Sequence, residues 1–363
     1  MRKILGFALV LFVAQNSFAA ELIINSKYVK KAALDPMSKV WNKAQAVSIP
    51  LIKQNLVAPH GGGAVKEVEV QSLYTDTEIF IRLMWADETK DSKFSLIEKF
   101  SDACAVEMPL NNGSLPSFIM GEKDNPVNIW VWHAIGEEKD KMGFPHAYSD
   151  YYRKDAMHAI LKFRPAVAEN LIAEGFGTVT PLEIQDLEGK GFWFKGKWRV
   201  VVKRSLRSNS GAVISEDANV PVAFAVWDGG NVDRDGAKSI SPWHLLRIGN
   251  APLLEKPKDE IEAGRRVYLR YGCVTCHGKE GKEKIENLNA QGGKVPALTY
   301  VAEGFTVNEL KDRIRNGRSP DKEIEDGPYP PLRMNAWKSV MDEDEIDSLV
   351  KYLLSLMPKT EKW

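Results

Sequence analysis

The chain contains CVTCH at residues 273–277, and this motif limits its fold more than any other feature. A Cys-x-x-Cys-His motif lets two thiols form thioethers with one haem, and the next histidine can bind the iron. A thioredoxin-type pair or half of a zinc site are the alternatives. The motif follows a predicted helix late in the chain, and the remaining cysteine, Cys104, lies far upstream. We therefore expect one covalent haem c on Cys273 and Cys276, with His277 as an axial ligand.

The N-terminal sequence predicts export. Basic residues precede an apolar stretch at 4–14, and small residues lead to Ala19 and Ala20. The stretch is shorter than the ~20 residues that a membrane span needs, so we expect a signal peptide at residues 1–20 and a periplasmic mature protein without a membrane span. An uncleaved anchor is the alternative. Haem attachment to cysteine takes place in exported compartments, which agrees with the prediction of a signal peptide.

Length and composition set wide bounds. The chain has 363 residues, which suggests two domains, and ten tryptophans that can supply a large core. The formal net charge is zero, so nothing points to nucleic acid or an acidic membrane surface as a partner. Haem attachment would leave Cys104 as an odd thiol, and its apolar neighbours predict a buried core residue.

The chain divides at residues 251–258, a stretch with prolines that we interpret as a linker. A helix predicted at 259–271 leads into the motif, and Gly264 allows a close approach to it. Two more predicted helices, at 306–316 and 342–356, each begin with a capping box and carry an apolar stripe. This pattern favours a small all-α region around one prosthetic group.

A proline-rich loop at residues 329–337 lies between the last two predicted helices and contains Met334. A thioether suits a high-potential electron-transfer haem, so we expect Met334 to bind the haem c iron. Met341 and Met357 lie beside helix ends and are interpreted as packing residues. With the helix before the motif, this loop and the terminal helix, residues 259–363 resemble a class I cytochrome c.

Residues 21–250 have a β pattern instead. Apolar residues alternate between positions 64 and 83 around a polar turn, and two further β-rich runs span residues 198–203 and 221–227. The pattern predicts a mainly antiparallel β-sandwich with helical insertions, for example at 151–161. The sequence contains no phosphate-binding, zinc-protease or serine-nucleophile motif.

Four segments of this region have distinctive sequences. They are DACAVEMP at 102–109, PSFIMG at 116–121, PVNIWVW at 126–132, and VAFAVWDG running on to GAKSIS within 222–241. In order and spacing they resemble the haem-b-binding gamma subunits of dimethyl-sulfoxide-reductase-type molybdenum enzymes. That family includes the gamma subunits of ethylbenzene dehydrogenase, dimethyl sulfide dehydrogenase, selenate reductase and chlorate reductase. The resemblance implies one non-covalent haem b in this region.

The resemblance also implies that Met120 and Lys238 bind the haem b iron. A lysine amine binds iron only when deprotonated, and burial against an apolar haem face would lower its pKa. Without the resemblance, Lys238 would be interpreted as a solvated turn residue and Met120 as core. Met108 is the alternative methionine, and His133 and His244 are alternative nitrogen ligands.

Charged residues near both predicted sites are open to two interpretations. Lys203 and Arg204 could pair with haem propionates or lie exposed at a strand end. Lys279, Lys282 and Lys284 could steer an acidic partner or belong to a solvated loop.

Gamma subunits of this family usually end after the haem b region, whereas this chain continues into a cytochrome c and so resembles the arrangement around nitrite oxidoreductases. We expect a dihaem electron-transfer subunit that is not itself an enzyme. Its partners would be a molybdenum catalytic subunit, an iron–sulfur subunit and a soluble cytochrome or similar redox protein. Two alternatives stay open: a free-standing b/c-type cytochrome serving another extracytoplasmic dehydrogenase, and a haem enzyme with an open axial position.

Overall fold

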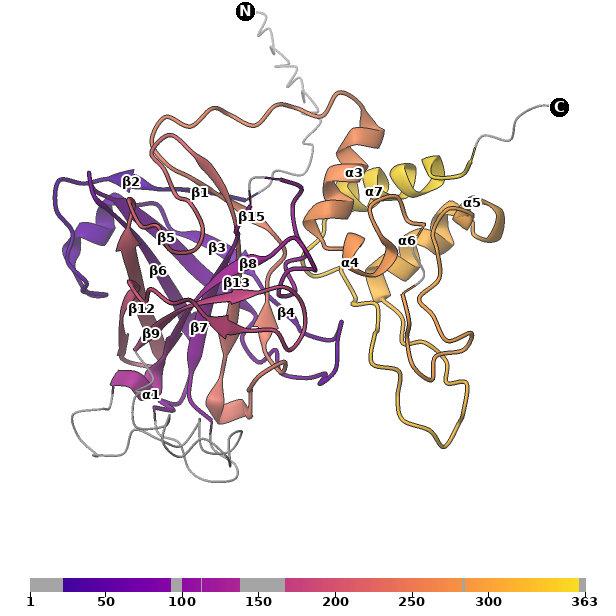
Figure 1. The fold of residues 1–363 in the computed structure, drawn as a ribbon, viewed down its shortest axis with the longest axis horizontal. Coiled ribbons are helices and arrows are strands. Elements are labelled where there is room, and N and C mark those ends of the chain that lie inside the picture. The colour runs from indigo at the N-terminus through magenta and orange to yellow at the C-terminus, as the bar shows by residue number, and fades with distance from the viewer. Residues whose placement is uncertain (1–21, 93–99, 112, 138–166, 283–284, 359–363) are drawn as a thin grey trace, which may run out of the picture.

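The computed structural model describes residues 22–92, 100–111, 113–137, 167–282 and 285–358 (Figure 1). The predicted signal peptide and the helical insertion predicted at 151–161 lie outside these ranges, as does Lys284. The N-terminal part of the chain forms two β-sheets, and the C-terminal part forms helices.

The larger sheet has the strand order β1-β15-β13-β7-β8-β9-β10, with β14 between β13 and β4. Its strands are β1 (Ile23–Asn25), β4 (Ile52–Lys53), β7 (Ala103–Pro109), β8 (Val127–His133), β9 (Ala168–Ala173), β10 (Thr180–Pro181), β13 (Asn219–Trp227), β14 (Ser239–Ile240) and β15 (His244–Arg247). Residues alternate between two faces in such strands. In β13, Val222, Phe224 and Val226 therefore face the sandwich core, while Ala223 belongs to a second cluster on the other face.

The smaller sheet has the order β11-β12-β6-β5-β2, and β3 also pairs with β5. Its strands are β2 (Lys27–Tyr28), β3 (Val47–Pro50), β5 (Glu67–Tyr74), β6 (Glu78–Ala86), β11 (Glu188–Trp193) and β12 (Lys197–Ser205). Strands β5 and β6 form the hairpin that the alternating sequence predicts, with Val70 paired to Leu83.

The two sheets pack face to face around one core, so the predicted β-sandwich is confirmed. Trp85 and Trp198 from the smaller sheet contact Trp132 from the larger one, with ring centroids 6.4 and 5.0 Å from that of Trp132. Cys104 is buried in the same core, as expected. The sandwich is not wholly antiparallel, because β1 pairs with β15 and β2 with β5 in parallel.

The C-terminal helices are α3 (Glu260–Arg270), α4 (Val274–His277), α5 (Val301–Gly304), α6 (Val307–Asn316) and α7 (Glu343–Ser355). Both predicted capping boxes are present, at Thr306 before α6 and at Asp342 before α7. Helices α3 and α7 cross at Gly264, where an added Cβ would lie 1.9 Å from the carbonyl oxygen of Ser348. The close approach expected at this glycine is therefore confirmed.

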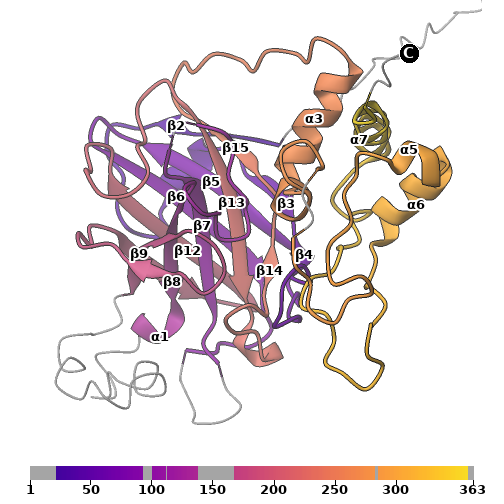
Figure 2. The same cartoon turned by 45° about the vertical axis from the view of Figure 1, so that its right-hand side comes forward.

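The helices lie along one side of the sandwich, beside β4 and β14 (Figure 2). One apolar cluster joins the two parts: Ile129 and Trp243 from the larger sheet side pack with Tyr271 and Trp337 from the helical part. Three short helical turns, η1 (Lys39–Lys43), α1 (Ala134–Glu137) and η3 (Gly229–Asn231), complete the described elements. Within these residues, no helix combines the length and hydropathy needed to cross a membrane.

Candidate functional site

The Cys-x-x-Cys-His motif forms the short helix α4 directly after α3. The ring Nδ1 of His277 lies 2.9 Å from the carbonyl oxygen of Pro296. This contact orients the ring and leaves Nε2 for a metal, as is typical of metal-bound histidines. Burial lowers the pKa of His277, which favours the neutral imidazole that binds iron. His277 therefore has the orientation that an axial haem ligand would need.

The loop that carries Met334 is held by a pair of backbone hydrogen bonds. The N–H of Met334 donates to the carbonyl of Arg318 at 2.9 Å, and the N–H of Arg318 donates back at 3.0 Å. Met334 and Cys273 are both partly buried against the same apolar cluster. Met341 instead lies in the core, and Met357 lies at the surface with 36% of its area exposed. The position of Met341 agrees with the packing role expected for it, whereas the exposed position of Met357 does not.

The structure brings Met120 and Lys238 together, although 118 residues separate them in the sequence. The Lys238 Nζ lies 3.8 Å from the Met120 Sδ. Met120 lies in the loop between β7 and β8 with a φ of 69°, and Gly121 follows with a φ of 72°. Few L-residues adopt this left-handed conformation. The turn places Met120 opposite Lys238, which directly precedes β14.

Small and apolar residues surround this pair on the outer face of the larger sheet. Ala105 pairs with Ala225 in the register of β7 and β13, and Ala223 pairs with Glu107. The Trp227 ring lies 4.9 Å from the Lys238 Nζ. Ala105 and Ala223 are buried in an apolar cluster, and the indole limits access of water to the amine.

The amine of Lys238 has an environment that suits metal binding. Burial lowers its pKa, and the nearby carboxyls of Glu107 and Asp235 oppose this shift. Burial also raises the pKa of Glu107 well above its usual range. A deprotonated amine and a thioether are donors that can bind a haem iron. The residues present therefore fit a haem b.

The alternative ligands lie in other surroundings. Met108 is fully buried in the sandwich core. His133 is paired with Glu169 at 3.3 Å. His244 is buried beside Arg270, at a hollow of about 370 Å³ between the two parts of the chain. Burial lowers its pKa to about 3, so this ring is neutral.

Lys203 and Arg204 have protein partners. The Lys203 amine pairs with Glu78 at 2.7 Å and with Glu188 at 2.9 Å. The Arg204 guanidinium is buried and donates to backbone carbonyls, including that of Ser210 at 2.5 Å. Both side chains therefore have partners within the sandwich. The buried Arg204 does not lie exposed at a strand end, and its guanidinium contacts backbone carbonyls, not a propionate.

One connection between the two candidate sites was not predicted from the sequence. Ser117, three residues before Met120, accepts a hydrogen bond of 2.7 Å from Thr275 within the haem-attachment motif. Beside it, an added Cβ on Gly272 would lie 2.7 Å from the Phe118 ring. The segment that carries Met120 therefore packs directly on the motif.

A second connection joins Lys238 to the Met334 loop through residues 53–58. The backbone N–H of Gln54 donates to the Lys238 carbonyl at 2.9 Å. Two residues further on, the Leu56 carbonyl accepts a 3.1 Å hydrogen bond from Arg333, which adjoins Met334.

Glu107 and Gln54 are site residues that the sequence did not reveal. For Glu107, a lone acid within an apolar strand was the available signal.

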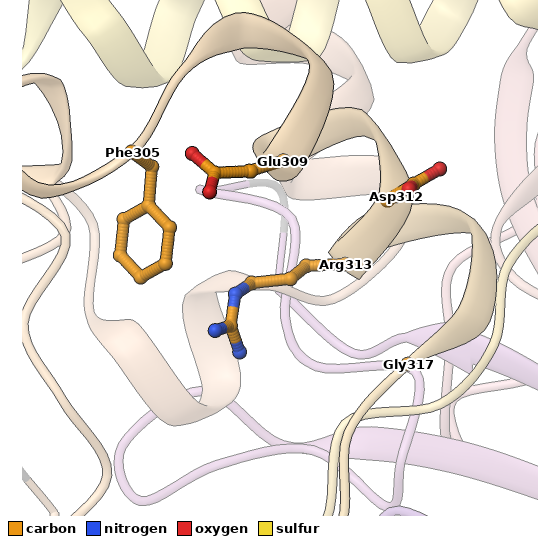
Figure 3. Close-up of a pocket in the computed structure, with 5 residues that line it drawn as sticks. All are labelled: Phe305, Glu309, Asp312, Arg313 and Gly317. Carbon is orange, nitrogen blue, oxygen red and sulfur yellow. The ribbon is translucent and has the colours of Figure 1, made fainter.

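A second hollow of about 280 Å³ lies on α6, and Gly317 in its lining adjoins Arg318, the partner of Met334. Figure 3 shows the Arg313 side chain lying below Phe305, and the guanidinium is 4.7 Å from the ring centroid. Glu309 and Asp312 line the same hollow, so its charges are mixed. It contains none of the candidate ligands.

Comparison with known proteins matches both parts of the chain. A family model described as ethylbenzene dehydrogenase matches residues 38–170, and a cytochrome c model matches residues 261–357. The chain is 32% identical over 237 residues to a protein of Haloferax mediterranei assigned as a respiratory nitrate reductase heme subunit. This match covers 64% of the chain and 75% of the relative.

Two gamma subunits are similar to a comparable extent. The chlorate reductase subunit gamma of Ideonella dechloratans is 30% identical, with 60% of this chain and 80% of the relative covered. The dimethylsulfide dehydrogenase subunit gamma of Rhodovulum sulfidophilum is 28% identical, with 59% and 75% covered. The chain therefore belongs to the haem-binding gamma subunits of molybdenum oxidoreductases, which transfer electrons and leave catalysis to a partner subunit, and it carries a class I cytochrome c region in addition.

Proposed function

We propose that this chain is a periplasmic dihaem electron-transfer subunit of a molybdenum oxidoreductase complex. In this proposal residues 1–20 are a cleaved signal peptide, residues 21–250 bind haem b, and residues 251–258 link them to a haem c region at 259–363. Electrons pass between the iron–sulfur subunit of the complex and a soluble cytochrome or similar redox protein. A molybdenum-containing subunit acts on the substrate.

The contact between Met120 and Lys238 is the observation that carries the haem b part of the proposal. Two side chains distant in sequence meet at 3.8 Å in an apolar setting, and burial lowers the pKa of the lysine. A lysine on an exposed turn would have neither property. Met120 and Lys238 would hold the haem b iron, and Trp227 would exclude water from the amine.

Cys273, Cys276, His277 and Met334 would hold haem c. The hydrogen bond between His277 and Pro296 keeps the imidazole oriented, and the paired backbone bonds to Arg318 keep the Met334 loop in place. When bound, each haem supplies one-electron oxidation and reduction at its iron, at a potential set by axial ligands and burial.

The contacts between the two parts of the chain support a direct route for electrons. Ser117 and Thr275 connect the Met120 segment to the attachment motif, and the stretch around Gln54 connects Lys238 to the Met334 loop. Both sites are thus fixed relative to each other by hydrogen bonds. An electron would not have to wait for a domain movement to bring them together.

The first test is a pyridine haemochrome spectrum of the full-length secreted protein, with iron counted per chain. We expect one haem b and one haem c. Haem c alone, in protein expressed with ample haem, would overturn the haem b assignment. A high-spin spectrum, or carbon monoxide binding to the reduced protein, would instead support a haem enzyme with an open axial position.

Variants then assign the ligands. Lys238→Ala should lose or loosen haem b and retain haem c, whereas Lys123→Ala, an exposed lysine near Met120, should retain both. Met334→Ala should lower the haem c potential and remove its methionine–iron absorption band, whereas Met357→Ala should change neither. Native haem b in the Lys238 variant would show that another residue is the ligand.

Co-purification separates this proposal from a free-standing cytochrome. A tagged chain isolated from its native host should bring with it a large molybdenum subunit and an iron–sulfur subunit. Isolation of the chain alone, under mild conditions that preserve known complexes, would favour a free-standing b/c-type cytochrome.

A further inference from the structure

Three buried aspartates meet at the end of the sandwich where the backbone of Asp102 accepts a hydrogen bond from Ala134, the first residue of α1. Asp87 follows β6, Asp102 precedes β7 and Asp228 follows β13. One carboxylate oxygen from each lies within 4.8 Å of the other two. The cluster therefore joins the smaller sheet, through β6, to the larger sheet, through β7 and β13.

The hydrogen-bond donors to these carboxyls are neutral in the described part of the chain. Asp102 accepts bonds from the N–H groups of Gly229 and Asp91 and from the Trp198 indole. Asp228 accepts two bonds from Asn231. Among the described residues no lysine or arginine forms an ion pair with the three aspartates. Up to three negative charges thus lie together in a buried place with no ion-pair partner in the described part of the chain.

Asp87 provides a second observation. Its side chain is only 4% exposed, and its Oδ1 accepts a bond from the N–H of Thr89 at 3.1 Å. Its Oδ2 is buried beside the two other carboxyls; the Trp85 indole N–H lies nearby, but neither atom forms a hydrogen bond of normal geometry among the described residues. A buried carboxylate oxygen without a partner is costly, so such an oxygen normally has a bound ligand or a proton.

We infer that Asp87, Asp102 and Asp228 bind a calcium ion that fastens the two sheets together at this end. Calcium takes hard oxygen ligands at about 2.3–2.6 Å, which places opposite oxygens of its shell about 5 Å apart. Oxygens within 4.8 Å of one another fit that shell. Magnesium demands shorter bonds and keeps several waters, which suits this buried, carboxylate-rich site less well.

The position suggests what the ion would do. Asp228 opens the loop that leads to Lys238, and η3 lies at the start of this loop. A cation bound to Asp228 and to Asp87 would hold that loop against the smaller sheet. The inference does not depend on haem binding. Among the described residues, no hydrogen bond joins the three aspartates to a candidate haem ligand.

The test uses the full-length protein with its haems. Metal content is measured after purification without chelator, and thermal unfolding is followed after dialysis against EGTA, with calcium or magnesium then added back. The variants are Asp87→Asn and Asp102→Asn, with Asp326→Asn, an exposed aspartate of the helical part, as the matched control.

We expect one calcium per chain in the wild type and in Asp326→Asn, and a melting temperature that falls on chelation and recovers with calcium. Asp87→Asn, which keeps the shape of the side chain, should lose the response and at least about tenfold in calcium affinity, since ligand charge sets affinity. Absence of bound calcium together with an unchanged wild-type melting temperature would overturn the inference. So would an Asp87→Asn protein that responds like the wild type.

Discussion

Replacing Gln54 by Ala should disturb both haem sites at once. The side chain is 4% exposed, and both the nitrogen and the oxygen of its amide form hydrogen bonds. Its Nε2 donates to the carbonyls of Val57 at 2.8 Å and Gly236 at 3.0 Å, and its Oε1 accepts from the Val57 N–H at 3.0 Å. Gly236 is two residues from Lys238, and Val57 forms a β-bridge with Leu332 beside the Met334 loop.

The size of the effect follows from the groups left without partners. In the Ala variant the N–H and carbonyl of Val57 and the carbonyl of Gly236 lose this amide, and each buried unsatisfied group costs about 1–3 kcal/mol. Partial relaxation of the loops would reduce the sum, so we expect a loss of about 3 kcal/mol. If the native loop geometry is needed for haem b, this loss corresponds to roughly 100-fold weaker binding.

Spectroscopy of the two haems measures this prediction. The Gln54→Ala protein should release haem b more readily to apomyoglobin, and its methionine–iron band from haem c should weaken. The matched control is Gln71→Ala, which removes a buried amide that donates to the carbonyls of Trp41 and Ala44 under the smaller sheet. That variant should lose comparable stability and keep both haem spectra. Equal behaviour of the two variants would refute the coupling through Gln54.

Three further predictions test the packing and the buried charges. Gly264→Ala should destabilise the helical part by about 3 kcal/mol, because its Cβ would overlap the Ser348 carbonyl, and chemical unfolding followed by haem c absorbance measures this. Ser117→Ala removes the hydrogen bond from Thr275 and should therefore slow electron transfer between the haems, with only a small loss of stability. Flash reduction measures the transfer rate. Without calcium, stability should fall as pH rises from about 4 to about 7. Burial raises the pKa of Asp102 from 3.8 to about 7, so the folded state holds a proton that the unfolded state releases; Asp102→Asn should flatten this melting-temperature profile.

The sequence predicted local structure well where one signal was strong. The capping boxes at Thr306 and Asp342 set the helix starts, and the alternation around the turn before Glu78 set the hairpin of β5 and β6. These features depend on residues a few positions apart, so a pattern can show them. The small residue at Gly264 likewise indicated the crossing of two helices.

Long-range pairing was beyond such patterns. The sandwich is mainly antiparallel, as predicted, but β1 and β2 are short and pair in parallel with strands formed by later residues, which the sequence did not indicate. No local signal in a strand of two or three residues specifies its partner. For the same reason the burial of Arg204 could not be foreseen, since its partners at Ser210 and Ala212 depend on how the following loop folds back.

The candidate ligands show a similar division. The motif that contains Cys273 specifies its own chemistry, because both thiols and the histidine are adjacent. Met120 and Lys238 came only from resemblance, since a methionine in a loop and a lysine after Asp235 have no intrinsic metal signal. The structure adds that the two side chains meet, and it adds Glu107, whose proximity to the lysine no spacing could indicate.

The contacts between the two parts of the chain explain why a tethered cytochrome would differ from a separate one. A soluble cytochrome must find its partner by diffusion, whereas a short linker keeps the second site at an effective concentration in the millimolar range. Here hydrogen bonds at Thr275 and Arg333 also fix the orientation, and both start from segments that carry candidate ligands. Electron transfer depends steeply on separation, so a fixed interface would make the internal step independent of collisions. The docking of an external cytochrome would then be the step that responds to ionic strength.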